Sequence, residues 1–269
     1  MIRVIKTDIF RAVRTKMFYA FPFFLVALQI LEFLLSAVMV ETETGEMQPV
    51  MSGVVLSAPN LLQHVGDGMI MLFLGLFIVA FCNDESKNGF LKNAAGRVPD
   101  RAFMPISKMI VGTLALFVYI VEAAIIRLAF VPIQFSVVGE KITWTPVPEG
   151  EKVQFVTYIV LCILGNMAFT ALLVLLHEVL HARAFGMVFA FLFATQLLDQ
   201  LLLMVQQILK SQFEIFKDME IGKYLMQSLM AEGYKAPLYS SGRLFAIAAV
   251  LGIASACAAI AVSRKKDIA

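Results

Sequence analysis

Long apolar stretches alternate with short polar segments along almost the whole chain. Each stretch holds roughly 15 to 26 residues, about the number that a helix needs to cross ~30 Å of hydrocarbon. Only Pro22 lies inside a stretch, and the other prolines lie in or beside the connections. The pattern predicts an all-α integral membrane protein with six transmembrane helices, over residues 17–40, 68–82, 106–131, 153–176, 186–209 and 244–262.

Two of the polar segments have a helical pattern of their own. Residues 1–16 place isoleucines at helical spacing, with basic residues elsewhere on the wheel. This pattern is typical of an interfacial helix with its basic side chains towards anionic headgroups, and equally of a positive anchor that only sets orientation. Residues 210–242 repeat apolar and charged side chains near helical spacing, which predicts a loop containing a short amphipathic helix.

The composition agrees with a membrane protein and removes other classes. Hydrophobic residues make up 60% of the 269 positions and charged residues only 16%, against about half and a quarter in soluble domains. This excludes a water-soluble enzyme of ordinary kind, a disordered chain and a disulfide scaffold. The three cysteines lie within apolar stretches, where a thiol acts as a small hydrophobe, so they predict neither disulfides nor a metal cluster.

The basic residues are concentrated on one side of the expected membrane. They gather in residues 1–16, in the connection 83–105 and at the C-terminal end, whereas the connection after the first stretch has none. Positive residues favour the cytoplasm, so we expect both termini inside and residues 210–242 outside. One transmembrane domain over residues 1–269 is expected, and no nucleic-acid partner is expected.

The connection 83–105 carries the most informative pattern in the chain. An acidic pair is followed by a glycine, a lysine before an asparagine, and two arginines: Asp84, Glu85, Gly89, Lys92, Arg97 and Arg101. Another lysine opens the next apolar stretch. Together with the basic N-terminal helix and the six-stretch layout, this order resembles the ABC-2 family of ATP-binding-cassette exporter permeases.

The resemblance implies a transport subunit rather than an enzyme, working in a bacterial plasma membrane with a second copy or a sister permease. It implies two copies of a cytoplasmic ABC ATPase as partners, contacted by the six residues just named. The substrates implied are amphipathic peptides (toxins, bacteriocins or lantibiotics) or hydrophobic drugs, for peptide export, immunity or antibiotic resistance. The chain has no GxxxxGK[ST] loop, so we expect no cofactor in it and expect the partner ATPase to bind ATP and Mg.

Polar side chains interrupt two of the apolar stretches at helical spacing. They include Gln29 and Glu32 in the first stretch and Gln196, Asp199 and Gln200 in the fifth. A charge inside hydrocarbon is costly, so such stripes favour a translocation path or a seam between two permease copies. Hydrogen bonds between helices of one bundle, worth about 0.6 kcal/mol each, explain the same stripes equally well.

A short motif between the fourth and fifth stretches indicates a different chemistry. His177 and His181 stand four residues apart with Glu178 between them, which matches the HExxH pattern of helical zinc proteases. The alternative function is therefore an intramembrane zinc metalloprotease, with Asp199 as the candidate third ligand. The residues around Asp199 lack a proline- or glycine-rich context, and the motif falls at an expected polar inner turn, so we rank the permease first.

Overall fold

The computed structural model describes residues 2–36, 39–41, 47–49, 56–87, 101–138, 144–212 and 220–265. Over these residues the chain is mainly helical, with one antiparallel hairpin, β1 (Met39–Glu41) and β2 (Met47–Pro49), and a single bridge between Leu56 and Trp144. The α-helices are α1 (Ile2–Arg14), α2 (Ala20–Ser36), α3 (Ala58–Leu61), α4 (Met69–Lys87), α6 (Phe103–Val138), α7 (Lys152–Leu180), α8 (Arg183–Ala194), α9 (Leu197–Gln212), α10 (Met226–Ala231) and α11 (Leu238–Lys265). Short 3₁₀ turns precede several of them: η1 (Lys16–Tyr19), η2 (Gln63–Val65), η3 (Glu149–Glu151) and η5 (Ile221–Tyr224).

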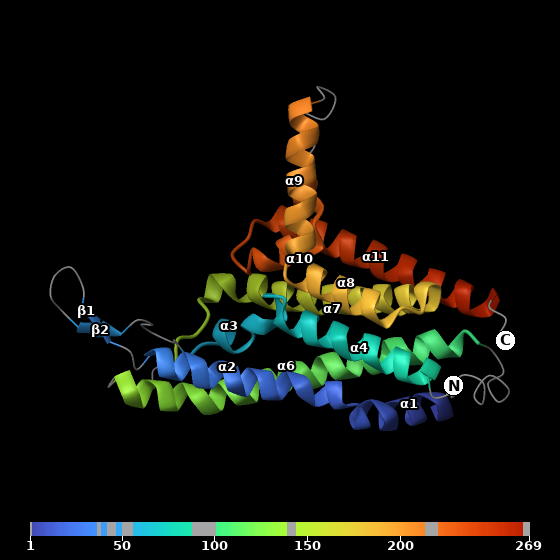
Figure 1. Ribbon diagram of the computed structural model, residues 1–269. Coiled ribbons are helices and arrows are strands. Elements are labelled where there is room, and N and C mark those ends of the chain that lie inside the picture. Colours follow the sequence, from blue (N-terminus) through green and yellow to red (C-terminus); the bar gives the residue numbers. More distant parts are fainter. Residues whose placement is uncertain are drawn as a thin grey trace.

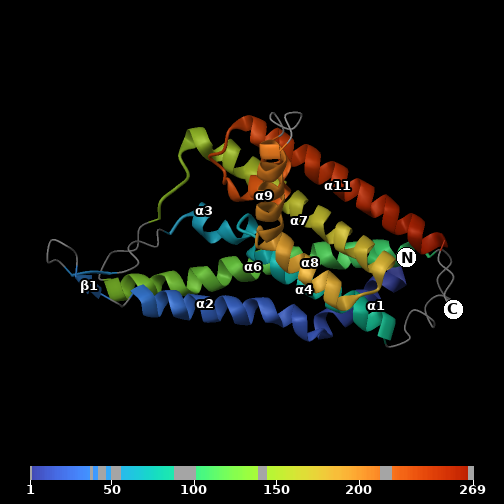
Figure 2. The same cartoon turned by 45° about the horizontal axis from the view of Figure 1, so that its top comes forward.

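The long helices form a bundle in which most helices run nearly along one axis (Figures 1 and 2). α2 lies beside α6 and α11 lies beside α7, with α4 between these two pairs. The hairpin lies at one end of the bundle. α1, the start of α6 and the ends of α7 and α11 lie at the other, which we call the basal end.

α4 is the central helix of the bundle. It packs against α6, α7 and α8, and its large side chains are almost fully buried, among them Ile70, Leu74, Phe77 and Phe81. The apolar part of α4 is too short to count as a candidate span, although the sequence predicts one over residues 68–82. The sequence predicts a span here because a helix that is buried in protein carries apolar side chains all round, as a membrane-spanning helix also does.

Three helical segments are long and apolar enough to cross a membrane: Phe103–Phe130, Glu149–Leu180 and Ser240–Lys265. Two bent pairs of helices, 4–31 and 183–212, raise the number to five if each pair is one span. The chain is therefore a mainly helical protein with three to five candidate membrane-spanning helices among its described residues. The first of them, in α6, belongs to a helix that continues past Pro132 to Val138 and so outlasts the predicted stretch.

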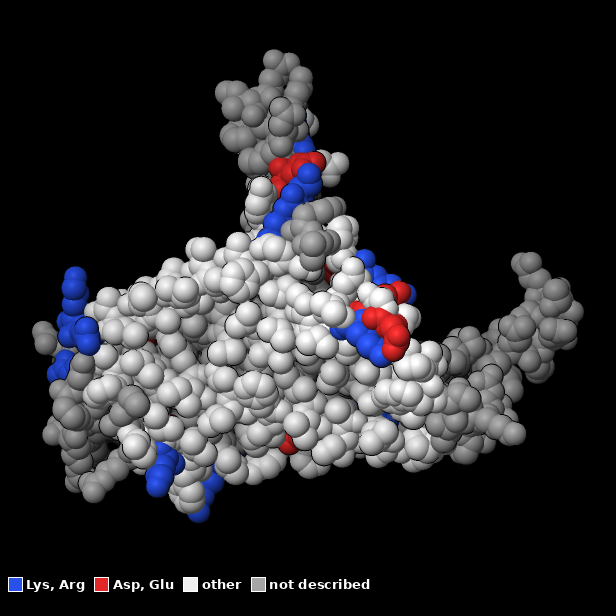
Figure 3. Space-filling view, turned by 180° about the vertical axis from the view of Figure 1, so that it is seen from behind, with Lys and Arg blue, Asp and Glu red and all other residues white. Residues whose placement is uncertain are grey.

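The surface of the bundle is apolar between charged ends. Large hydrophobic side chains face outward, such as Ile125 on α6, Val156 on α7 and Val250 on α11, each at least 60% exposed. Figure 3 shows charged side chains at both ends and on the projecting helix, with a broad, almost uncharged face between them. A lipid environment suits such a face, because exposed apolar patches of this extent are rare on soluble monomers.

The predicted fifth span, residues 186–209, is two helices rather than one. α8 and α9 meet at an angle of 73°, and α9 projects from the bundle (Figure 1). The backbone N–H of Thr195 bonds to Phe191, and Gln196 then adopts a left-handed conformation with φ of 61°. Apolar residues continue on both sides of this turn, so the hydropathy pattern does not reveal it.

Within its described residues, the predicted loop 210–242 contains the short helix α10. Met226, Gln227, Leu229 and Met230 of α10 are buried, so α10 packs into the protein. Residues 213–219 lie outside the described part of the chain.

Candidate functional site

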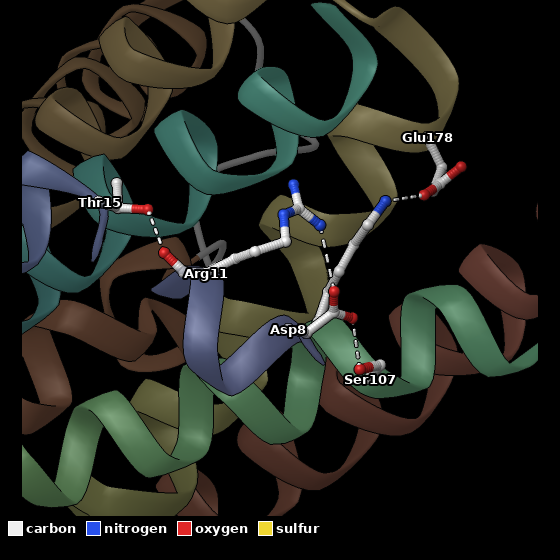
Figure 4. A network of polar contacts seen from close by, with 6 residues as sticks. Asp8, Arg11, Thr15, Ser107 and Glu178 are labelled. Carbon is white, nitrogen blue, oxygen red and sulfur yellow. Dashed lines mark hydrogen bonds and ion pairs between the residues drawn. The ribbon is translucent and has the colours of Figure 1, made fainter. Parts of the chain in front are cut away.

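A carboxylate attaches α1 to the first turn of α6. Asp8 is only 2% exposed, although α1 is otherwise basic. Its Oδ2 accepts a hydrogen bond of 2.6 Å from the Ser107 hydroxyl, and its Oδ1 accepts one of 3.1 Å from Arg11 Nη1 (Figure 4). α1 thus turns its Asp8 and Ala12 face to the bundle, while Ile2 and Val13 stay exposed.

A buried ion pair joins the next residue of α6 to the end of α7. Lys108 Nζ donates to Glu178 Oε1 at 2.7 Å, with the two side chains 1% and 9% exposed (Figure 4 labels Glu178). Taking two charges out of water is unfavourable unless they are paired and hydrogen-bonded. Such a pair holds its two helices in one register, because separating them would leave charges in an apolar interior.

These contacts form one group, which we call the basal network: Asp8, Arg11, Ser107, Lys108 and Glu178. It connects α1, α6 and α7 within two adjacent positions of α6. A further bond brings in α11, because the Ser263 hydroxyl donates to the Arg101 carbonyl at 3.1 Å. The basal end is thus where polar contacts join four helices that elsewhere in the bundle meet mainly through apolar side chains.

The predicted ATPase-coupling residues lie on both sides of a gap in the described chain. Asp84 and Glu85 are in the last turn of α4, and the side chain of Glu85 lies outside the described residues. Arg101 lies in the turn before α6, and Asp84 lines a cavity at the basal end. Three other residues, Gly89, Lys92 and Arg97, fall outside the described residues, as does most of the segment 83–105.

Within one copy of the chain, the described residues of the two predicted polar stripes lie apart. Gln29 is buried in α2, which lies on the opposite side of the bundle from α9 in Figures 1 and 2, and the side chain of Glu32 lies outside the described residues. Gln196 forms the turn between α8 and α9, and Gln200 is exposed on α9.

Asp199 has a structural partner instead of a cavity. Its Oδ2 accepts hydrogen bonds from the backbone N–H of Ser228 at 3.0 Å and from the Ser228 hydroxyl at 2.6 Å. Asp199 is 3% exposed, and these bonds tie the base of α9 to the first turn of α10. A carboxylate that accepts an N–H in a first helical turn stabilises that turn.

The HExxH motif has a geometry of its own. α7 ends at Leu180, and His181 follows in a left-handed conformation with φ of 53°, so the two histidines do not project from one helix. Their rings stack 5.7 Å apart, and Glu178 between them is paired with Lys108. Within the described residues, no three His, Cys, Asp or Glu side chains are grouped to hold a metal ion.

A second polar cluster lies away from the basal end. His64 Nδ1 is 2.7 Å from Asp67 Oδ2, and His64 Nε2 is 3.4 Å from Arg127 Nη1. His64 and Arg127 are both 6% exposed. An arginine inside an apolar stretch is a signal for such a partner, but its spacing along the chain does not identify His64, which lies 63 residues away.

Comparisons with protein-family models, with curated proteins and with solved structures find no significant match to this chain. The roles considered below therefore rest on the chain's own residues and contacts.

Proposed function

We propose that the chain is the transmembrane permease subunit of an ATP-driven exporter of the ABC-2 type, working as a pair in a bacterial plasma membrane with both termini in the cytoplasm. Its substrates are amphipathic peptides or hydrophobic drugs, and a separate ATPase binds ATP and Mg. The observation that carries the proposal is the basal network, which fixes α1 and α7 to the start of α6. The segment 83–105, which the proposal assigns to ATPase coupling, includes the first residues of α6.

Mechanical coupling needs a stiff connection between the contacted segment and the membrane helices. A push on residues 83–105 reaches Arg101 and the first turn of α6, where Ser107 holds α1 and Lys108 holds α7. Because both contacts are buried and charged, α6 cannot shift alone without separating these partners. The helices then move together, as rigid-body transitions between two states require. ATP biases these states only through contacts that differ between them.

A zinc protease is the second candidate, and the HExxH motif supports it. Two observations favour the permease over it: Glu178 is engaged by Lys108, and His181 follows the end of α7. Metal analysis of the purified protein separates the two functions. Stoichiometric zinc that is lost in a His177→Ala/His181→Ala variant supports the protease, and its absence from active protein supports the permease.

The partner is tested by affinity purification from native membranes in a mild detergent, followed by mass spectrometry of the soluble subunits that are recovered. We expect an ABC ATPase with the wild-type chain and at least about tenfold less of it with Arg101→Glu, since a tenfold change needs only ~1.4 kcal/mol. The matched control is Lys152→Glu, a charge reversal at an exposed site where α7 begins, and it should recover the ATPase at the wild-type level. Recovery of folded chain with no ATPase, or equal recovery from both variants, contradicts the proposal.

A further inference from the structure

A cavity of about 640 Å³ opens at the basal end. It lies between α1 with η1, the last turns of α4 and the first residue of α8. The polypeptide bends by 61° between Val4–Arg14 and Lys16–Leu31, and residues on both sides of this bend line the cavity.

Four cationic residues and one carboxylate line this cavity: Arg11, Arg14, Lys16, Arg183 and Asp84. Arg11 is already compensated, because it is paired with Asp8 at 3.1 Å. The other three cations have no carboxylate within ion-pair distance among the described residues, and all three are exposed. Asp84 is the carboxylate among the described residues that line the cavity, so this described lining has a positive excess.

The cavity also has an apolar side. Phe81 and Ala80 of α4 and Met17 of η1 line its inner wall, and Phe81 and Ala80 belong to the buried core of the bundle. Phe10 lies on the outer rim, 58% exposed, with the Arg14 guanidinium 4.0 Å from its ring centroid. A ligand that fits here has a compact anionic group next to an apolar part.

We propose that this cavity binds the phosphate group of an anionic phospholipid, with the first carbons of its acyl chains against the Phe81 wall. The guanidinium group of arginine and the ammonium group of lysine bind phosphate oxygens. Basic pockets between membrane helices bind the headgroups of anionic lipids. Free phosphate shares the charge but leaves the apolar wall exposed to water. The cavity lies where α4 ends and α8 begins, at the basal end of the bundle, and the site does not depend on the transport function.

The test uses the full chain, purified in neutral detergent and stripped of lipid, with native mass spectrometry to count bound lipid. The probes are phosphatidylglycerol, phosphatidylcholine and inorganic phosphate, each titrated separately. The site variant is Lys16→Gln/Arg183→Gln. The matched control is Lys6→Gln/Lys265→Gln, which removes two exposed cations from α1 and α11 at the same end of the bundle but outside the cavity.

We expect one phosphatidylglycerol molecule to bind more tightly than phosphatidylcholine. Its affinity should fall at least about tenfold in the site variant, because each cation near an anionic headgroup contributes to the free energy of binding. The control should stay within about twofold of wild type. Equal losses in both variants would show a diffuse surface attraction and overturn the proposal. Inorganic phosphate that displaces phosphatidylglycerol at equal concentration would identify a soluble phosphate site and overturn it as well. If the double variant does not elute as a single folded species, the single variant Arg183→Gln replaces it with the same criteria.

Discussion

Lys108 illustrates how a single side chain organises this molecule. It is a charged residue with 1% of its surface exposed, two positions after the start of the apolar stretch 106–131, and its ammonium group pairs with Glu178 on another helix. A buried pair of this kind adds little net stability over a well-packed apolar pair, whereas removing one member is strongly unfavourable. The pair therefore specifies which helices meet more than it raises stability.

Replacing Lys108 by Met tests this reasoning. We expect Lys108→Met to lower the free energy of unfolding by about 3–5 kcal/mol, because the Glu178 carboxylate loses its buried ammonium partner. The double variant Lys108→Met/Glu178→Leu should recover most of that loss. The measurement is the unfolding midpoint in detergent, and the control is Lys152→Met, whose exposed pair with Glu149 should contribute less than about 1 kcal/mol. A double variant as unstable as the single one would argue against the pairing.

Gly68 is a second residue whose type is fixed by its surroundings. Its φ is +89°, and a Cβ built there would lie against the Ala194 carbonyl oxygen and 2.6 Å from Gln227 Nε2. The chain can therefore bring the start of α4 against the end of α8 only with glycine at this position.

We expect Gly68→Ala to cost about 2–5 kcal/mol, from the strain of a left-handed alanine together with the overlap. Gly150→Ala is the matched control, because nothing lies within 4 Å of its Cβ position, and its effect should stay within about 0.5 kcal/mol. The change in the free energy of unfolding of each variant is measured by thermal unfolding in the same detergent. Equal stability of the two variants would contradict the close approach of α4 and α8.

Spacing along the chain identified polar residues but not their partners. Asp199 stood out as a carboxylate in an apolar stretch, and its actual partner, Ser228, lies 29 residues further on in a short helix. Glu178 stood out through the histidines on either side, yet its partner is 70 residues upstream. The sequence does not predict a buried role for Asp8, because a single acidic residue in a basic segment resembles a solvated one. A period of 3.6 shows which face of a helix a residue occupies, whereas the helix opposite that face is set by tertiary packing.

At the scale of elements, the hydropathy pattern predicts where helices occur but does not distinguish a helix in lipid from a helix buried in protein. The six apolar stretches all contain helix, but α4 is buried in protein and the stretch 186–209 is divided at Gln196. Burial in protein and burial in lipid both select apolar side chains, so composition alone does not separate them. The turn at Gln196 uses a residue type that is not usual for a left-handed conformation, so the sequence carries no glycine signal there.

α1 is the element whose attachment is most open to test. Asp8 holds it to α6 through the charge-assisted hydrogen bond from the Ser107 hydroxyl, a type of bond that contributes about 1.5–3 kcal/mol. Asp8→Asn should weaken this bond, so the amides of α1 should exchange at least about tenfold faster with deuterium, while those of α7 and α11 keep their rates. Lys6→Gln, on the exposed side of α1, is the control and should leave exchange unchanged. Uniform acceleration across the bundle, or none in α1, would mean that Asp8 does not anchor the helix.

At the scale of the whole molecule, charge and polarity divide the protein into an apolar middle and a basal end rich in contacts. The basal network, the Ser263 bond to Arg101 and the cationic cavity beside Arg14, Lys16 and Arg183 all lie at that end. A membrane gate of the kind we propose, driven from one side by a separate motor, would need its helices connected at that side.

The most direct measurement of this account is ATP-dependent uptake in liposomes. Vesicles carrying the chain alone, and vesicles carrying it with the co-purified ATPase, are given a fluorescent amphipathic peptide with and without ATP. The account predicts that peptide accumulates only when both the ATPase and ATP are present. Accumulation in vesicles that contain the chain alone, or without ATP, would contradict it.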